Sequence, residues 1–172
     1  MRTPNWRLRP LVLLVAPLLA LANGVTPYVG LKTVANFSMF SNLHTEEGTT
    51  NHLLPGVTAL ELAGYPRDTV TVVGLELPEQ PGDMTALSRQ TRWMNEDPPV
   101  RIPWLELRRT VLLWKDAGIT GVRIAYLHDG PPQVVDNATK DPVLAAPLPW
   151  WQRHLLAFRA VDSGAGADIC RW

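Results

Sequence analysis

Residues 103–127, PWLELRRTVLLWKDAGITGVRIAYL, carry the clearest structural pattern of the chain. Trp104, Leu107, Val111 and Trp114 recur at the spacing of one helical face, which predicts a helix that packs this stripe into a core. Pro103 suits the first helical turn, and a glycine at position 118 stands where a C-terminal cap is expected. The charged residues fall off the apolar stripe, so we expect them on a solvated face: Arg108, Arg109, Lys115 and Asp116.

Strand signals lie on both sides of this helix. Gly121–Leu127 reads as a strand, and Asp129-Gly130 is a turn signal that returns the chain through Gln133–Val135. Earlier, Thr69–Leu77 alternates well enough to be a strand, and Pro149–Leu156 is expected to form a short helix. Three further extended segments are predicted: Thr33–Leu43, Asn51–Leu54 and Ala157–Val161. The order of strands, helix, hairpin, helix and strand favours an α+β fold, that is, one small domain of mixed sheet and helix.

The composition is that of one ordinary folded domain. The chain has 172 residues, is 46% hydrophobic, and balances 16 basic against 16 acidic side chains. A net charge near zero provides no basic surface for nucleic acid, so no nucleic-acid partner is expected. The single cysteine, Cys170, excludes an internal disulfide framework.

An uncharged run from Pro10 to Leu31 follows Arg2, Arg7 and Arg9. As a secretory signal it has a basic start, an apolar stretch over Leu11–Ala22 and a cleavage-like Ala20-Leu21-Ala22. As a spanning helix it is short, because the strictly apolar part is nearer to about 12 residues than to the roughly 20 that cross a bilayer. Trp6 and Tyr28, however, are separated by about the thickness of a bilayer core. Either alternative exports the remainder, because the arginines precede the run.

Several strings resemble a segment of uncharacterised bacterial multi-spanning membrane proteins in the horizontally transferred transmembrane, or vitamin K-dependent carboxylase-like, grouping. The strings are Asn23–Thr33 (NGVTPYVGLKT), Asn36–Leu43 (NFSMFSNL), Thr45–Gly48 with Asn51-His52, Phe158–Asp162 and Cys170–Trp172. The resemblance covers Leu11 to Trp172 and implies that Asn23 and Gly24 end a retained helix. It supplies no established activity, and no carboxylase catalytic residue carries over, because this sequence lacks the helices that would hold them.

These patterns predict three segments. Residues 1–9 form a cytoplasmic basic N-terminus, residues 10–29 a single transmembrane helix, and residues 30–172 an extracytoplasmic α+β domain. The expected location is the cell membrane, and the candidate partners are the membrane itself and a multi-spanning membrane protein. The expected role is a non-catalytic interaction or accessory module, and a secreted binding protein if the N-terminus is cleaved.

One polar cluster has residue types suited to chemistry. It comprises Asn42, His44, Glu46, Glu47, Asn51 and His52. Histidine and carboxylate groups are ligands for a transition metal, so a metal-assisted hydrolase is the alternative function. The spacing matches no established metal motif, and no catalytic residue, metal or cofactor is expected. Two alternatives stay open for Phe40: it packs under a helix of the same domain, or it forms with Asn42 a contact patch for a membrane-embedded partner. His128 and His154 are expected to be a turn residue and an exposed residue.

Overall fold

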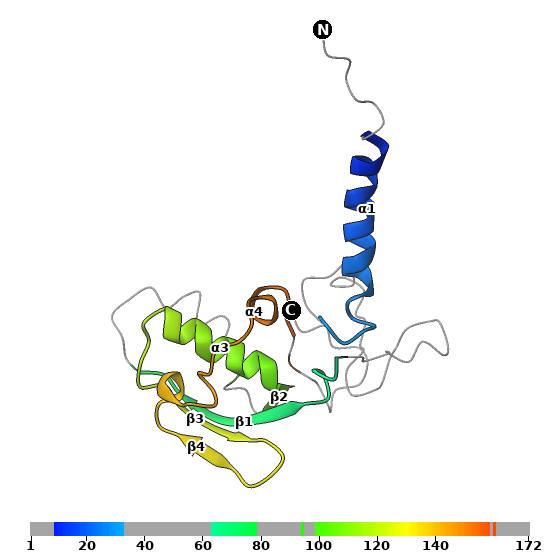
Figure 1. The fold of residues 1–172 in the computed structure, drawn as a ribbon. Coiled ribbons are helices and arrows are strands. Elements are labelled where there is room, and N and C mark those ends of the chain that lie inside the picture. Colours follow the sequence, from blue (N-terminus) through cyan, green and yellow to red (C-terminus); the bar gives the residue numbers. More distant parts are fainter. Residues whose placement is uncertain (1–8, 33–62, 79–93, 95–98, 159, 161–172) are drawn as a thin grey trace.

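A four-stranded antiparallel sheet lies at the centre of the fold (Figure 1). The computed structural model describes residues 9–32, 63–78, 94, 99–158 and 160. The sheet has the order β2-β1-β3-β4. Its strands are β1 (Thr69–Glu76), β2 (Val100–Pro103), β3 (Arg123–Leu127) and β4 (Gln133–Val135). The helical elements are α1 (Arg9–Val25), α3 (Trp104–Asp116), the 3-10 turn η2 (Ala138–Lys140) and α4 (Trp150–His154). The predicted α+β class is confirmed.

One face of the sheet forms the core together with α3. In β1, Val70 and Val72 are buried, and a register irregularity between Val72 and Gly74 then brings Leu75 to the buried side. A bulge of this kind inserts one residue into a strand and shifts its alternation. The inner face of α3 contributes Leu107, Val111 and Trp114, all fully buried, as the helical spacing predicts.

The ends of α3 follow from the sequence around them. Pro103 precedes the first helical residue, with ψ near 136°, and has no side-chain cap bond. At the other end, the backbone N–H of Gly118 donates to the Lys115 carbonyl at 3.1 Å and that of Ile119 to the Trp114 carbonyl at 2.9 Å. With Gly118 at φ +74°, this is a Schellman end, and the predicted glycine cap is confirmed.

The charged face of α3 is solvated only in part: Lys115 and Asp116 are exposed as expected, whereas Arg108 and Arg109 are half-buried. The Arg108 guanidinium donates to the Ala146 carbonyl at 3.0 Å, and Lys115 Nζ donates to the Ala145 carbonyl at 3.4 Å. Arg153 forms an ion pair with Asp116. Charged residues of α3 therefore contact the returning chain between residues 144 and 158.

The strand predictions divide into three groups. Thr69–Leu77 and the hairpin around Asp129-Gly130 are confirmed, with β3 and β4 paired in the register Ile124↔Val135. β2 was not predicted, since it has four residues and a proline at its end. The predicted strands Thr33–Leu43 and Asn51–Leu54 lie outside the described residues.

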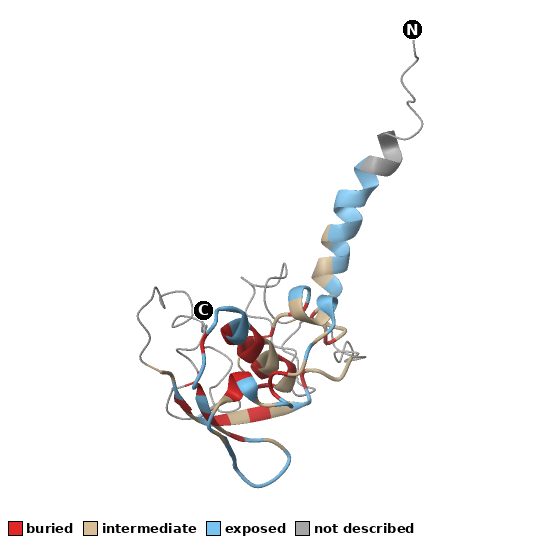
Figure 2. Ribbon diagram, turned by 60° about the vertical axis from the view of Figure 1, so that its left-hand side comes forward, coloured by how far each residue is buried: buried red, intermediate tan, exposed pale blue. Residues whose placement is uncertain are grey.

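Helix α1 projects away from the sheet and α3 (Figures 1 and 2). It has 17 residues, includes Pro17, and is followed by a series of turns that ends at Lys32. Within the residues that the structure describes, no helix combines the length and the apolar character needed to cross a membrane. Lys32 forms an isolated parallel bridge with Ala157, and Leu31 packs against Leu105, Leu156 and Phe158.

Candidate functional site

The residues of the predicted polar cluster and contact patch are not described by the structure, whereas His128 and His154 are, and His154 is exposed as expected. Phe40, Asn42, His44, Glu46, Glu47, Asn51 and His52 all belong to the segment 33–62, which lies outside the described residues. The predicted metal cluster and the predicted contact patch therefore stay predictions. Three other places in the described part of the chain have side chains that could bind a metal, titrate or contact a partner.

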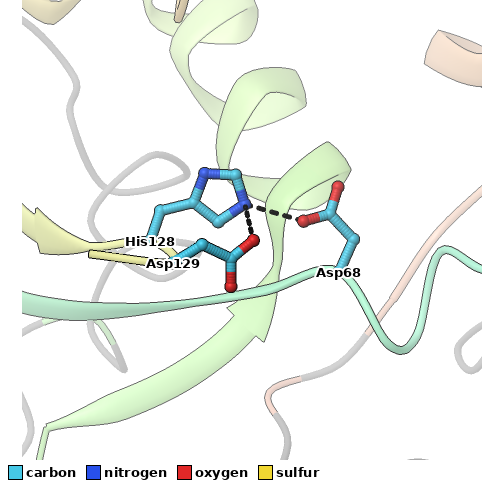
Figure 3. A group of neighbouring side chains, drawn as sticks. All are labelled: Asp68, His128 and Asp129. Atoms are coloured by element: carbon cyan, nitrogen blue, oxygen red, sulfur yellow. Dashed lines mark hydrogen bonds and ion pairs between the residues drawn. The ribbon is translucent and has the colours of Figure 1, made fainter.

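The first is a group of three side chains, Asp68, His128 and Asp129, which we call the Asp–His group (Figure 3). Asp68 directly precedes β1, and His128 and Asp129 follow β3, so the antiparallel pairing of β1 with β3 brings them together. The Nε2 atom of His128 lies 2.7 Å from Asp68 Oδ1 and 3.9 Å from Asp129 Oδ2. Asp129 adopts φ +47°, in the left-handed region, within the connection over residues 128–132 that joins β3 to β4.

Trp104 holds the imidazole of the Asp–His group in place. The two rings stack with their centroids 4.4 Å apart and an interplanar angle of 11°. The backbone N–H of Trp104 also donates to the Asp68 carbonyl at 2.7 Å, so the first residue of α3 contacts both partners. The aromatic stack and this hydrogen bond fix the histidine against the start of α3.

The Asp–His group offers donor atoms of the kinds that bind transition metals. Its three ligand atoms lie within 4.8 Å of one another, and within the described residues no other trio of His, Cys, Asp and Glu side chains meets this limit. The side chain of Asp129 is 92% exposed, that of Asp68 is 50% exposed, and the short Asp68–His128 contact already satisfies one carboxylate oxygen. The arrangement supports most directly a hydrogen-bonded link between the β1 entrance and the β3–β4 turn.

Sequence reasoning treated His128 and Asp129 as turn residues and missed Asp68. The prediction that these residues connect two strands is confirmed, because Asp129-Gly130 lies between β3 and β4. Asp68 lies 60 positions away in the sequence from His128. The only available signal was that strands predicted at 69–77 and 121–127 would place their ends together if paired antiparallel.

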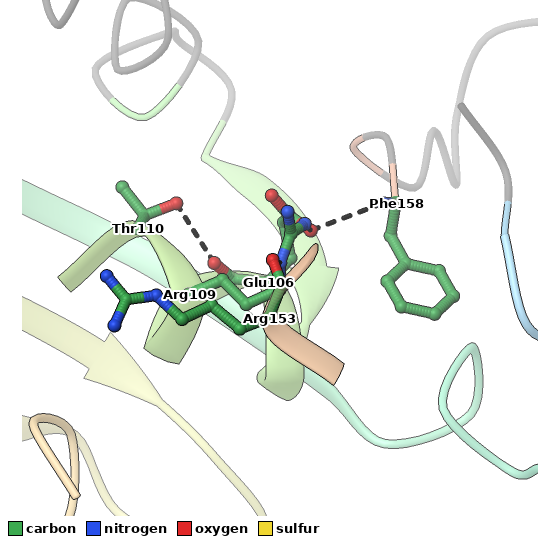
Figure 4. Close-up of polar contacts among 5 residues, drawn as sticks. All are labelled: Glu106, Arg109, Thr110, Arg153 and Phe158. Carbon is green, nitrogen blue, oxygen red and sulfur yellow. Dashed lines mark hydrogen bonds and ion pairs between the residues drawn. The ribbon is translucent and has the colours of Figure 1, made fainter. Parts of the chain in front are cut away.

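The second place is a polar cluster around Glu106 on α3 (Figure 4). Its carboxylate accepts from Arg109 at 2.5 Å and from the backbone N–H of Phe158 at 3.2 Å. Arg109 Nε donates in turn to the Arg153 carbonyl at 3.1 Å. Burial raises the pKa of Glu106 above its ordinary value, while the charge of Arg109 and the two hydrogen bonds partly oppose that rise. The cluster joins α3 to the chain on both sides of Leu155 and has a structural role.

The third place is an apolar surface carried by α1 and α4. From residue 13 onward, where the structure describes side-chain burial, the large apolar side chains of α1 are between 43% and 75% exposed, and the set is Leu13, Leu14, Val15, Leu18, Leu19, Leu21 and Val25. Figure 2 shows this exposure along most of α1. No residue of α4 is buried, and Trp150, Trp151 and Leu155 at and after this helix are 66%, 44% and 52% exposed.

Comparisons with known proteins supply no family for this chain. No protein-family model, no curated protein and no solved structure matches the sequence or the fold. The chemistry and the exposure of the described side chains therefore have to carry the functional argument.

Proposed function

We propose that this protein is a membrane-anchored α+β domain that acts as a non-catalytic interaction or accessory module, with α1 as its anchor. The observation that carries the proposal is the exposure of the apolar side chains of α1. A helix at the surface of a water-soluble protein normally has one polar face, whereas α1 has no charged residue after Arg9. A lipid environment removes this apolar surface from water.

Helix α1 is shorter than a typical spanning helix, so the proposed anchor requires a bilayer that becomes thinner around it. Its 17 residues span about 25 Å, compared with roughly 30 Å for a typical hydrocarbon core. Thinning of the bilayer around a short helix costs only fractions of a kcal/mol per Å. Tyr28 follows in the turns after α1, at a level where an aromatic ring favours the membrane interface.

The charges around α1 support an orientation. Arg2, Arg7 and Arg9 precede the apolar run, so the positive-inside rule keeps them in the cytoplasm and places the α+β domain on the other side. The resemblance at Asn23–Thr33 supports the same arrangement and suggests a multi-spanning membrane protein as partner. The competing proposal is a cleaved signal peptide, which would give a secreted binding protein.

Membrane fractionation of the full chain tests the anchor. We expect the protein, expressed in bacteria, to stay in the membrane pellet after alkaline carbonate washing. Its intact mass should be that of a chain that begins at or near Met1. Leu18→Arg places a charge at the middle of α1, which costs about 2.5–3.5 kcal/mol at the centre of a spanning helix, and should move much of the protein to the soluble fraction. Val134→Arg is the matched control, because Leu18 and Val134 are 60% and 56% exposed. A soluble protein whose intact mass is that of a chain beginning at Asn23 would establish the secreted alternative.

A further inference from the structure

We infer that α4 forms a second membrane contact, in which Trp150, Trp151 and Leu155 enter the interfacial layer of the bilayer that holds α1. This inference rests on the proposed anchor and names the lipid surface as the partner of a particular face of the domain.

The base of α1 is tied to the chain on both sides of α4. Leu31, soon after α1, packs against a cluster that contains Leu105, Leu156 and Phe158, and Leu148, just before α4, packs against the same cluster. Lys32 also bridges to Ala157 through the backbone. These contacts hold α4 next to the point where the chain leaves α1.

The direction of α1 places α4 on the membrane side of the domain. Figure 1 shows α4 on the side of α3 toward which α1 rises, whereas β3 and β4 lie at the opposite end of the domain. Figure 2 is rotated from Figure 1 about the vertical axis, so the heights of α4 and of the β3–β4 hairpin are the same in both views. A bilayer around α1 would therefore lie nearer to α4 than to the β3–β4 hairpin.

The chemistry of α4 fits the interface better than water. Tryptophan combines a large apolar ring with an N–H donor and is enriched at the boundary between headgroups and acyl chains. The polar side chains of α4 already have partners inside the domain. Gln152 donates to the Tyr65 hydroxyl at 2.9 Å, Arg153 pairs with Asp116, and the His154 Nδ1 atom lies 2.9 Å from the Trp150 carbonyl. The apolar surface is what α4 leaves for a partner, so the contact should form on uncharged lipid and need no anionic headgroup.

Site-specific fluorescence on the full chain tests the contact. In a Cys170→Ser background, one cysteine at a time is placed at Leu18, Leu155 or Val134, labelled with the environment-sensitive dye NBD, and reconstituted into phosphatidylcholine vesicles. These positions are 60%, 52% and 56% exposed, so differences report their surroundings and not their burial in the protein. We expect doxyl-labelled lipid to quench the dye at positions 18 and 155, and aqueous iodide to quench it at position 134.

The outcomes separate the two proposals. Lipid quenching at position 18 with full iodide quenching at position 155 overturns the α4 contact and leaves the anchor in place. Iodide quenching at position 18 overturns both. If the dye at position 155 is protected from iodide in native membranes but not in pure lipid vesicles, the α4 surface contacts a protein. That result overturns the lipid contact.

A further variant tests whether the tryptophans make the contact. Trp150→Ser combined with Trp151→Ser should lower lipid quenching at position 155 several-fold and leave position 18 unchanged. Val73→Ser combined with Leu127→Ser is the matched control on the exposed side of the sheet, since these residues are 43% and 36% exposed. Unchanged lipid quenching at position 155 after loss of both tryptophans would overturn the inference.

Discussion

Glu106 shows how one partly buried carboxyl can join two parts of the fold and yet make stability depend on pH. Its carboxylate accepts from Arg109 on its own helix and from the backbone of Phe158. Desolvation nevertheless raises its pKa above the ordinary value of 4.5. The folded state therefore binds the Glu106 proton more tightly than the unfolded state does. This contribution to stability is fully present below the unfolded pKa and is lost as the pH rises through the folded pKa.

Glu106→Gln should therefore change the pH dependence of unfolding. Glutamine keeps an oxygen for the Phe158 N–H but does not titrate. We expect the free energy of unfolding of the native chain to fall, relative to that of the variant, as the pH rises from about 4.5. Urea unfolding of both proteins from pH 4 to pH 8 measures this difference.

The control for this experiment is Glu76→Gln. Glu76 is 72% exposed and pairs with Arg123 at 3.4 Å, so its removal changes the net charge equally without altering a buried group. An exposed pair of this kind contributes about 0–1 kcal/mol. If the difference between the native chain and Glu106→Gln is constant across the pH range, the buried carboxyl does not contribute as described.

At the scale of elements, the C-terminal end of α3 depends on a glycine. Gly118 has φ +74°, and a Cβ there would meet no atom within 4 Å, so only the backbone conformation opposes a side chain. Gly118→Ala should therefore lower the free energy of unfolding by about 1 kcal/mol. Thermal unfolding measures the change.

Gly130→Ala is the matched control for this helix end. Gly130 lies outside the left-handed region, and its Cβ would be 3.8 Å from the His128 carbonyl oxygen, an ordinary contact. We expect the free energy of unfolding of the Gly130→Ala variant to be unchanged or slightly raised, because alanine restricts the unfolded chain. An equal loss of stability in Gly118→Ala and Gly130→Ala would show that the Schellman end does not depend on the glycine conformation.

At the scale of the whole molecule, the proposed anchor fixes the side of the membrane on which the domain lies. In a Cys170→Ser background, Val134→Cys should react with a membrane-impermeant maleimide in bacteria whose outer membrane alone has been opened. Thr3→Cys should react only after the inner membrane is also permeabilised, because the arginines near it stay in the cytoplasm. Labelling of intact and lysed cells, read by gel shift, checks both positions. The reverse pattern would contradict the orientation.

The sequence by itself determined the elements whose signals are local. The helix of residues 104–116 follows from a spacing of three and four residues and from Gly118, and the β3–β4 hairpin follows from Asp129-Gly130. Each of these features depends on groups within a few positions of one another, so neighbouring residues suffice to specify them.

Only the tertiary structure decided the contacts between distant segments. β2 is too short and too rich in flanking prolines to be read alone, and it becomes a strand because β1 offers it a free edge. Asp68 meets His128 because β1 pairs with β3. The charged face of α3, expected in water, is in part covered, because backbone carbonyls of Ala145 and Ala146 accept from its Lys115 and Arg108 side chains. Such contacts depend on which surfaces the whole chain buries together, and no local pattern encodes that choice.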